Sequence, residues 1–180
     1  MHHDPAIPAL GPIVDLAWNE IQSVRLSNGE TIPSLDESLS AMLKPPTPIG
    51  EVWIELKSLP ESSDTTLLEA IDRSPLPGRC AVHSFDHRIV ARLGRRRPSL
   101  RRGVLSASYP LDPVAPMVAA GGSALWQEWH LIDGPLVDAV HRSGGELIAW
   151  AVNEAEPARR LERLGVDTLC GNWPDRLRSG

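Results

Sequence analysis

The stretch "EVWIELK" at residues 51–57 decides how the rest of the chain is interpreted. Its side chains alternate in kind along Val52, Trp53, Ile54, Glu55, Leu56 and Lys57. A period of two is typical of a β-strand whose two faces have different surroundings. One face is aliphatic, and the other ends in a carboxylate and an ammonium, Glu55 and Lys57. This pattern indicates either a functional pair at the strand end or an internal ion pair.

Apolar runs and helix-like stretches alternate along the remaining sequence. The apolar runs lie at 79–85, 102–108, 146–153 and 166–172, and the helix-like stretches lie at 65–74, 86–98, 134–145 and 154–165. This alternation is typical of βαβ units and a parallel sheet, so we predict an α/β fold. The segment 123–132 fits either a strand or an irregular connector. In a β/α barrel, Trp53, Glu55 and Lys57 would face the lumen, the last two at the rim.

Length and composition limit the class of protein. A chain of 180 residues predicts one domain, 1–180, with a real core. The net charge of −5 and the pI near 5.7 argue against a nucleic-acid partner. No run approaches the roughly 18 apolar residues of a membrane span. The start "MHHDPAIPAL" has no signal-peptide pattern, and Cys80 and Cys170 lie in apolar runs, which favours a cytoplasmic setting with reduced thiols.

Two polar clusters have plain structural interpretations. "RLGRRRPSLRR" at 92–102 suits phosphate or nucleic acid, but arginines also favour a helix C-terminus, so we interpret the run as a solvent-exposed helix end. His83, Asp86 and His87 resemble a metal cluster in composition. We do not predict a second metal site there, and we interpret Ser84, Phe85 and Asp86 as residues at a strand end.

Five short stretches occur in a fixed order along nearly the whole chain. They are "HD" at 3–4, "GETIPSLDE" at 29–37, "ELK" at 55–57, "SFD" at 84–86 and "WAVN" at 150–153. Each is common alone. In this order and spacing they resemble the glycerophosphodiester phosphodiesterase family of phospholipase-C-like barrels.

The resemblance implies a (β/α)8 TIM barrel with a divalent cation that hydrolyses glycerophosphodiesters to glycerol phosphate and an alcohol, within glycerol and lipid metabolism. His3 matches an acid/base histidine, and such a group is needed because the leaving alkoxide requires a proton. Asp4 would orient its imidazole. Glu55 matches a carboxylate ligand of Mg²⁺ or Ca²⁺, and Lys57 would contact a phosphoryl oxygen. Trp150 would pack on the glycerol end.

Asn153 would support the site just beyond Trp150. The sequence also departs from the family pattern, because it has no His-Arg-Gly and no Glu-x-Asp, the motifs of the family's first strands. We therefore expect an incomplete barrel lacking its first strands, a native start further upstream, and little or no activity from these 180 residues. A smaller departure is Gly171-Asn172, where the family has Thr-Asp.

Two other functional classes remain open at this stage. The chain could be an inactive member that keeps the fold, or a βα domain that binds a partner through exposed strand edges. An open seam in the barrel would leave unpaired backbone groups, and such edges template pairing with another chain. We therefore also expect self-association of the isolated chain.

Overall fold

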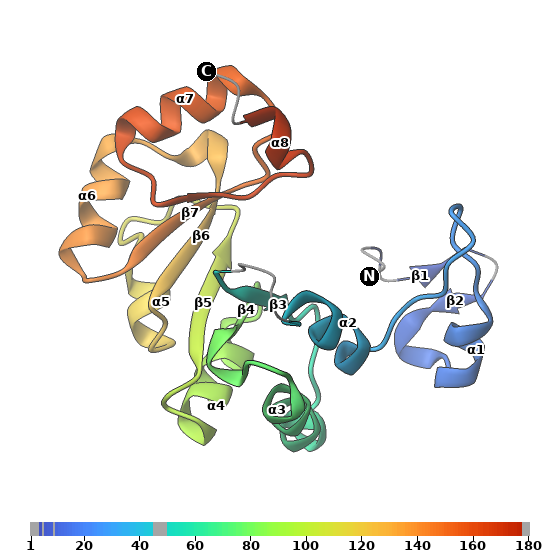
Figure 1. Ribbon diagram of the computed structural model, residues 1–180. Coiled ribbons are helices and arrows are strands. Elements are labelled where there is room, and N and C mark those ends of the chain that lie inside the picture. Colours follow the sequence, from blue (N-terminus) through green and yellow to red (C-terminus); the bar gives the residue numbers. More distant parts are fainter. Residues whose placement is uncertain (1–3, 5, 9, 45–49, 178–180) are drawn as a thin grey trace. The chain divides into compact units, whose positions relative to one another are not determined.

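The computed structural model describes residues 4, 6–8, 10–44 and 50–177 (Figure 1). The chain divides into two compact units. The first comprises residues 1–52 and 61–79, and the second comprises residues 53–60 and 80–180. The assignment of 1–180 to one domain stays a prediction, and each unit is described by itself.

The first unit is mainly helical. Its elements are the antiparallel pair β1 (Ala6–Ile7) and β2 (Gly11–Pro12), the 3-10 turns η1 (Ile13–Asp15), η2 (Glu61–Ser63) and η3 (Pro77–Arg79), and the helices α1 (Trp18–Ser23), α2 (Leu35–Met42) and α3 (Asp64–Arg73). A capping box starts α2: the Glu37 N–H donates to Ser34 Oγ at 3.2 Å, and the Ser34 N–H donates to Glu37 Oε2 at 2.7 Å. Arg73 donates two hydrogen bonds to Asp36, which join α3 to α2. Part of the 29–37 stretch therefore has a structural role.

The second unit contains a sheet of six strands among the described residues. In sheet order these are β3 (Val52–Glu55), β4 (Cys80–Ser84), β5 (Arg101–Ser106), β6 (Ala124–Glu128), β7 (Glu146–Trp150) and β8 (Thr168–Leu169). Each pair from β4 to β8 is parallel. Strands that follow one another in the sequence are also neighbours in the sheet, so each connection leads to the next strand in the same direction across the sheet. The undecided segment 123–132 proves to contain β6, followed by the 3-10 turn η4 (Trp129–Leu131).

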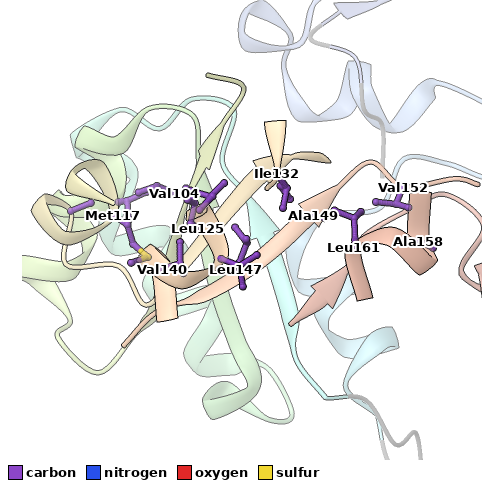
Figure 2. Close-up of a cluster of buried hydrophobic side chains, with 14 residues drawn as sticks. Val104, Met117, Leu125, Ile132, Val140, Leu147, Ala149, Val152, Ala158 and Leu161 are labelled. Atoms are coloured by element: carbon purple, nitrogen blue, oxygen red, sulfur yellow. The ribbon is translucent and has the colours of Figure 1, made fainter. Parts of the chain in front are cut away.

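Helices cover one face of this sheet. They are α4 (His87–Arg96), α5 (Ala115–Ala119), α6 (Gly134–Arg142) and α7 (Ala155–Leu164), and α8 (Pro174–Leu177) ends the described chain (Figure 1). Between sheet and helices lies an aliphatic core (Figure 2) that includes Val104, Leu125, Leu147, Met117, Leu136, Val140 and Leu161. Fully burying such a side chain stabilises a fold by about 1.5–3 kcal/mol. The predicted α/β class is confirmed.

The other face of the sheet is concave. The rings of Trp53 on β3 and Trp126 on β6 lie 5.3 Å apart, and those of Phe85 after β4 and Trp150 on β7 lie 5.4 Å apart. In each pair the strands are three places apart in the sheet order. On a flat sheet the strands would be separated by roughly 14 Å, since neighbouring strands lie about 4.8 Å apart. The sheet therefore curls as the wall of a barrel does, with the aromatic side chains inside.

A glycine makes this inner packing possible. A Cβ atom on Gly103 of β5 would lie 2.9 Å from the Ala124 carbonyl oxygen and 3.1 Å from Cδ1 of Trp126. The indole of Trp126 thus occupies the space that a side chain at position 103 would fill. Among the described residues, no helix has the length and hydropathy that crossing a membrane requires.

Candidate active site

Glu55 and Lys57 lie together where β3 ends. Glu55 is the last residue of the strand, and Lys57 Nζ lies 2.6 Å from Glu55 Oε1. The Lys57 side chain is 50% exposed and that of Glu55 is 29% exposed. The two groups form an ion pair, and this pair lies at the carboxyl end of its strand, where sites in this kind of sheet form. A functional role for the pair stays a prediction.

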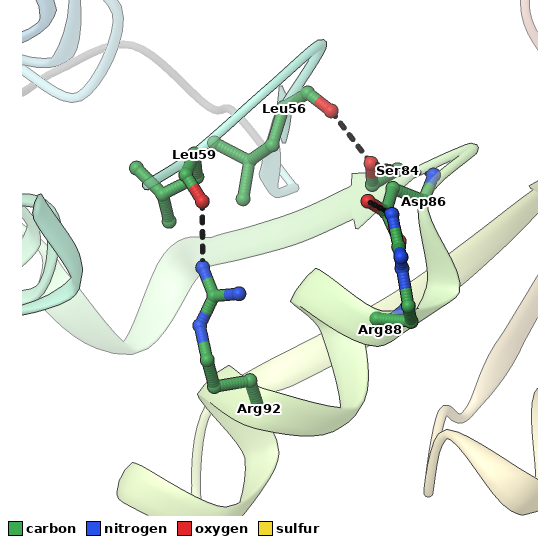
Figure 3. A network of polar contacts seen from close by, with 6 residues as sticks. All are labelled: Leu56, Leu59, Ser84, Asp86, Arg88 and Arg92. Carbon is green, nitrogen blue, oxygen red and sulfur yellow. Dashed lines mark hydrogen bonds and ion pairs between the residues drawn. The ribbon is translucent and has the colours of Figure 1, made fainter. Parts of the chain in front are cut away.

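Side chains of the next strand and helix anchor the backbone on both sides of Lys57 (Figure 3). The Ser84 hydroxyl donates to the Leu56 carbonyl oxygen at 2.6 Å, and Arg92 Nη2 donates to the Leu59 carbonyl oxygen at 2.7 Å. Ser84 is buried. A buried hydroxyl with a good partner fixes the backbone that it contacts, so the direction of the Glu55 and Lys57 side chains is set by β4 and α4.

The "SFD" stretch continues this anchoring. The Asp86 N–H donates to Ser84 Oγ at 3.0 Å, and the Asp86 carboxylate accepts hydrogen bonds from the Arg88 N–H and guanidinium as it caps α4. The hydrogen bonds from Arg88 hold the pKa of Asp86 at about 2. Asp86 is thus engaged in helix capping. Within residues 4–44 and 50–177, no three His, Cys, Asp or Glu side chains gather in a way that suits a metal ion.

Trp150 and Asn153 follow one another at the end of β7. The Trp150 ring meets the edge of Phe85, and its buried Nε1 has no hydrogen-bond partner in the described structure. Asn153 Oδ1 accepts from the Asn172 N–H at 2.8 Å, which ties the loop after β8 to the end of β7. A Cβ atom on Gly171 would collide with the Val152 carbonyl oxygen. Glycine at 171, one of the departures from the family pattern, is therefore required by this close backbone approach.

Sequence reasoning missed His83 as a residue of the inner face. Its ring is 6% exposed and lies 4.1 Å from the ring of Trp126 and 5.7 Å from that of Trp53. The pKa of His83 is lowered to about 4, chiefly by burial; the charge of Glu55 opposes this shift, and that of Lys57 adds to it. The imidazole is therefore neutral at pH 7. The alternation of Ala81, His83 and Phe85 carried a signal for this position, but only the strand register shows which residues it meets.

Glu128 is a second inner-face residue that was missed. It pairs in register with Trp150, so it lies at the same end of the sheet. Its carboxylate contacts His130, with Oε1 2.5 Å from Nδ1 and Oε2 accepting the His130 N–H at 3.0 Å. This carboxylate is satisfied within its own turn.

The predicted site residues are divided between the units. Glu55, Lys57, Trp150 and Asn153 belong to the second unit and Asp4 to the first, whereas His3 lies outside the described residues. Apart from its ion pair with Lys57, Glu55 Oε1 has no hydrogen-bond donor among the described residues. A cation such as Ca²⁺ takes six to eight oxygen ligands. The single carboxylate of Glu55 can fill one ligand position, and it does not by itself make a cation site.

The five stretches and the curled sheet agree with a comparison against known families. A sequence model described as the "Glycerophosphoryl diester phosphodiesterase family" matches residues 2–176. The chain belongs to this family. Among curated proteins it is 26% identical over 173 residues to a glycerophosphodiester phosphodiesterase of Arabidopsis thaliana, covering 89% of this chain and 52% of that protein. A glycerophosphodiester phosphodiesterase of Caldanaerobacter subterraneus is 26% identical over 156 residues, covering 83% and 61%.

The chain of this phosphodiesterase family member thus spans between half and two thirds of the length of these curated relatives. Solved structures agree on the fold. A glycerophosphodiester phosphodiesterase from Parabacteroides distasonis superposes with a TM-score of 0.86 at 20% identity, covering 98% of this chain and 75% of that one. A phosphodiesterase from Oleispira antarctica, in complex with the product sn-glycerol-3-phosphate, gives 0.86 at 18% identity, covering 98% and 76%. At these identities the likeness establishes the fold: the described sheet is part of a TIM-barrel wall.

Proposed function

We propose that this chain acts in the hydrolysis of glycerophosphodiesters to glycerol 3-phosphate and an alcohol, a step of glycerol and lipid metabolism. The observation that carries the proposal is the family match over residues 2–176, together with the Glu55–Lys57 pair at a strand end. The relative from Oleispira antarctica is described with the product sn-glycerol-3-phosphate, which supports the choice of substrate class.

Lys57 and Trp150 would bind the substrate. The half-exposed ammonium of Lys57 is free to turn from Glu55 toward a non-bridging phosphoryl oxygen, a charge-assisted contact. The indole of Trp150 offers an apolar surface to the glycerol carbons. Asn153 would keep the loop after β8 beside this indole through its bond to the Asn172 N–H.

His3, oriented by Asp4, would donate the proton that the leaving alcohol needs. Water attacks phosphorus, the bond from phosphorus to the alcohol oxygen breaks, and a proton must reach the departing alkoxide. An imidazole titrates near neutral pH and suits this transfer. Asp4 would hold the His3 ring in the orientation that presents its proton.

Glu55 would contribute one ligand to a divalent cation, Mg²⁺ or Ca²⁺. When bound, such a cation offsets negative charge on the phosphoryl oxygens. Its other ligands would come from substrate oxygens, water or residues beyond the described part of the chain. The position of Glu55 at the end of β3, with only Lys57 beside its Oε1 among the described residues, supports this role.

A reducing compartment such as the cytoplasm is the setting that we propose. Neither Cys80 nor Cys170 forms a disulfide. Burial raises the pKa of Cys170, and the charge of Glu55 adds to this, so the thiol is unreactive. Cysteines that form no disulfide are typical of proteins from reducing compartments.

The test is ligand binding by the 180-residue protein in Mg²⁺ or Ca²⁺, followed by NMR during titration with sn-glycerol 3-phosphate and glycerophosphocholine. We expect Lys57→Met to weaken binding by about tenfold, since a charged hydrogen bond contributes about 1.5 kcal/mol. Lys44→Met is the matched control and should leave affinity unchanged. A protein that binds neither compound, or a Lys57→Met variant with unaltered affinity, would contradict the proposal.

Release of glycerol 3-phosphate should be measured on the same sample. The sequence holds one of the family's two motif histidines, and a missing acid/base group costs about 10²–10⁴-fold. We therefore expect turnover by these 180 residues to be far below that of the longer relatives. Turnover equal to theirs would show that His3 is not half of such a pair.

A further inference from the structure

A polar pocket lies on the helix side of the sheet. It is formed between α4 and α5, has a volume of about 330 Å³, and is lined by two arginines, Arg95 and Arg102, and by small residues that include Gly94, Ala119 and Gly121. Arg95 is in the last turn of α4, and Arg102 is near the start of β5. The pocket is therefore near the amino ends of the strands, whereas Glu55 and Lys57 lie at a carboxyl end. It is separate from the proposed active site.

The charge around this pocket is one-sided. Between Asp86 and Asp112 the sequence has seven arginines and no acidic residue, in a chain whose net charge is −5. Two of these arginines are neutralised elsewhere, because Arg88 pairs with Asp86 and Arg101 pairs with Glu146. Arg95 is exposed, and no carboxylate pairs with it in the described parts of the chain. A cluster of this kind has positive charge available for an anion.

Arg102 is held rigidly, but its charge is not neutralised. Its Nη1 donates to the carbonyl oxygens of Leu100 at 2.9 Å and Pro98 at 3.2 Å. These acceptors are uncharged, so the guanidinium keeps its formal charge. Its Nε is buried and finds no acceptor among the described residues.

Two glycines allow the remaining edge of this guanidinium to lie close to the backbone. A Cβ atom on Gly94 would lie 2.5 Å from Arg102 Nε, and one on Gly121 would lie 3.0 Å from Nη2. Gly121 also has a φ of +62°, which side chains rarely adopt. A side chain at either position would displace the guanidinium, so the two glycines keep the charge of Arg102 at the wall of the pocket.

We propose that this pocket binds a phosphate-type oxyanion through Arg95 and Arg102. The guanidinium of Arg102 supplies a fixed donor, Arg95 supplies a second charge from the end of α4, and Ala119 and Gly121 give the anion space. The anion is either a free phosphate or the phosphate of a lipid headgroup, and both present the same oxygens.

The test is a titration of the ¹⁵N-labelled 180-residue protein with inorganic phosphate at constant ionic strength, with chloride as the reference anion. We expect saturable shifts of the amides of Arg95, Ala119 and Gly121, distinct from any shifts at residues 55–57. Arg95→Ala should weaken this binding by about tenfold, in line with one lost charged hydrogen bond. Ala119→Leu should also weaken it by filling the pocket without a change of charge.

Arg142→Ala is the matched control, because Arg142 is likewise an exposed arginine in the last turn of a helix. It should leave the phosphate affinity unchanged. Arg102 is not varied, since its bonds to the 98–100 loop make it a part of the fold.

Vesicles distinguish the two sources of the anion. Binding to phosphatidylglycerol vesicles but not to phosphatidylcholine vesicles, lost in Arg95→Ala, would identify a lipid headgroup. Phosphate shifts without vesicle binding would identify a free anion. Absence of pocket shifts with both probes, equal shifts with chloride, or an unaltered response in Arg95→Ala would each overturn the proposal.

Discussion

The two faces of the second unit's sheet differ in chemistry. The helix-covered face packs aliphatic side chains such as Leu125 and Leu147 against the helices, and its core cluster contains no titratable group. The concave face presents tryptophans and His83, and several of its buried polar atoms have no partner among the described residues: His83 Nδ1, Trp126 Nε1 and Trp150 Nε1. The helix-covered face has one such atom among the described residues, Arg102 Nε. The concave face has more hydrogen-bonding capacity left over, which is what a site for ligands and water requires.

The largest effect should come from the helix-covered face. Leu147 is fully buried there. We expect Leu147→Ala to lower the free energy of unfolding by about 4 kcal/mol, since it removes buried methyl groups and leaves a cavity. Leu111 is fully exposed, so Leu111→Ala is the matched control and should stay within about 0.5 kcal/mol of the wild type in urea denaturation. A loss below about 1 kcal/mol for Leu147→Ala would mean that this core is loosely packed.

The next effect is a pH dependence that originates on the concave face. An unfolded histidine takes up a proton near pH 6.5, whereas folded His83, whose pKa is lowered by burial, does so only near pH 4. The free energy of unfolding is therefore unaffected by His83 above pH 6.5 and should fall by up to about 3 kcal/mol as the pH drops to 4.

Chemical denaturation between pH 7 and pH 4 measures this fall. His83→Gln keeps a polar side chain that cannot titrate, so this part of the pH dependence should vanish in the variant. An equal slope in both proteins would show that His83 is not the group responsible. Asp86, with a pKa of about 2, affects stability only at lower pH and does not confuse the comparison.

A smaller effect should come from the link between β3 and β4. Ser84→Ala removes the donor to the Leu56 carbonyl oxygen and the acceptor of the Asp86 N–H. Leaving such buried groups unpaired costs about 2 kcal/mol. Thermal or urea unfolding checks this, with the exposed Ser99→Ala as a control. If the variant also binds glycerol 3-phosphate less tightly, the anchoring of Lys57 matters for the site; stability equal to the wild type would show that water replaces the hydroxyl.

The smallest effect should follow Trp126→Phe. This change keeps an aromatic ring against His83 and removes an N–H that has no described partner. No hydrogen bond is lost, but the smaller ring leaves a small cavity, so we expect the free energy of unfolding to fall by about 1 kcal/mol. A loss above about 3 kcal/mol would exceed the cost of that cavity and would mean that the indole N–H is hydrogen-bonded in solution. The contrast between the two faces would then be weaker than described.

The sequence was most informative where the periodicity was unbroken. The predicted strands at 79–85 and 146–153 contain β4 and β7, and the one at 102–108 overlaps β5, which begins one residue earlier. The segment 123–132 stayed undecided because β6 ends inside it at Glu128, and a 3-10 turn continues the apolar run. Helix α5 was not predicted, because it is only five residues long and has Pro116 in its first turn.

The site was predictable along one strand but not between strands. Alternation in 52–57 was enough to put Glu55 and Lys57 on one face. The environment of His83 depends on β3 and β6, which are far from it in sequence, so no local pattern announces it. The same holds for Arg102, whose surroundings are set by glycines on α4 and after α5. Register and sheet curvature bring these groups together, and neither is encoded in a short window.

The pairing of Gly103 with Trp126 has a consequence for how this lumen can be redesigned. The two positions share one volume, because the indole fills the space above the glycine. A larger residue at 103 is expected to be harmful alone and tolerated once 126 is smaller, so the two substitutions should show strong positive coupling in a double-mutant cycle. Libraries that vary single positions would record both sites as intolerant. Varied together, the two positions would allow the shape of the barrel interior to be changed.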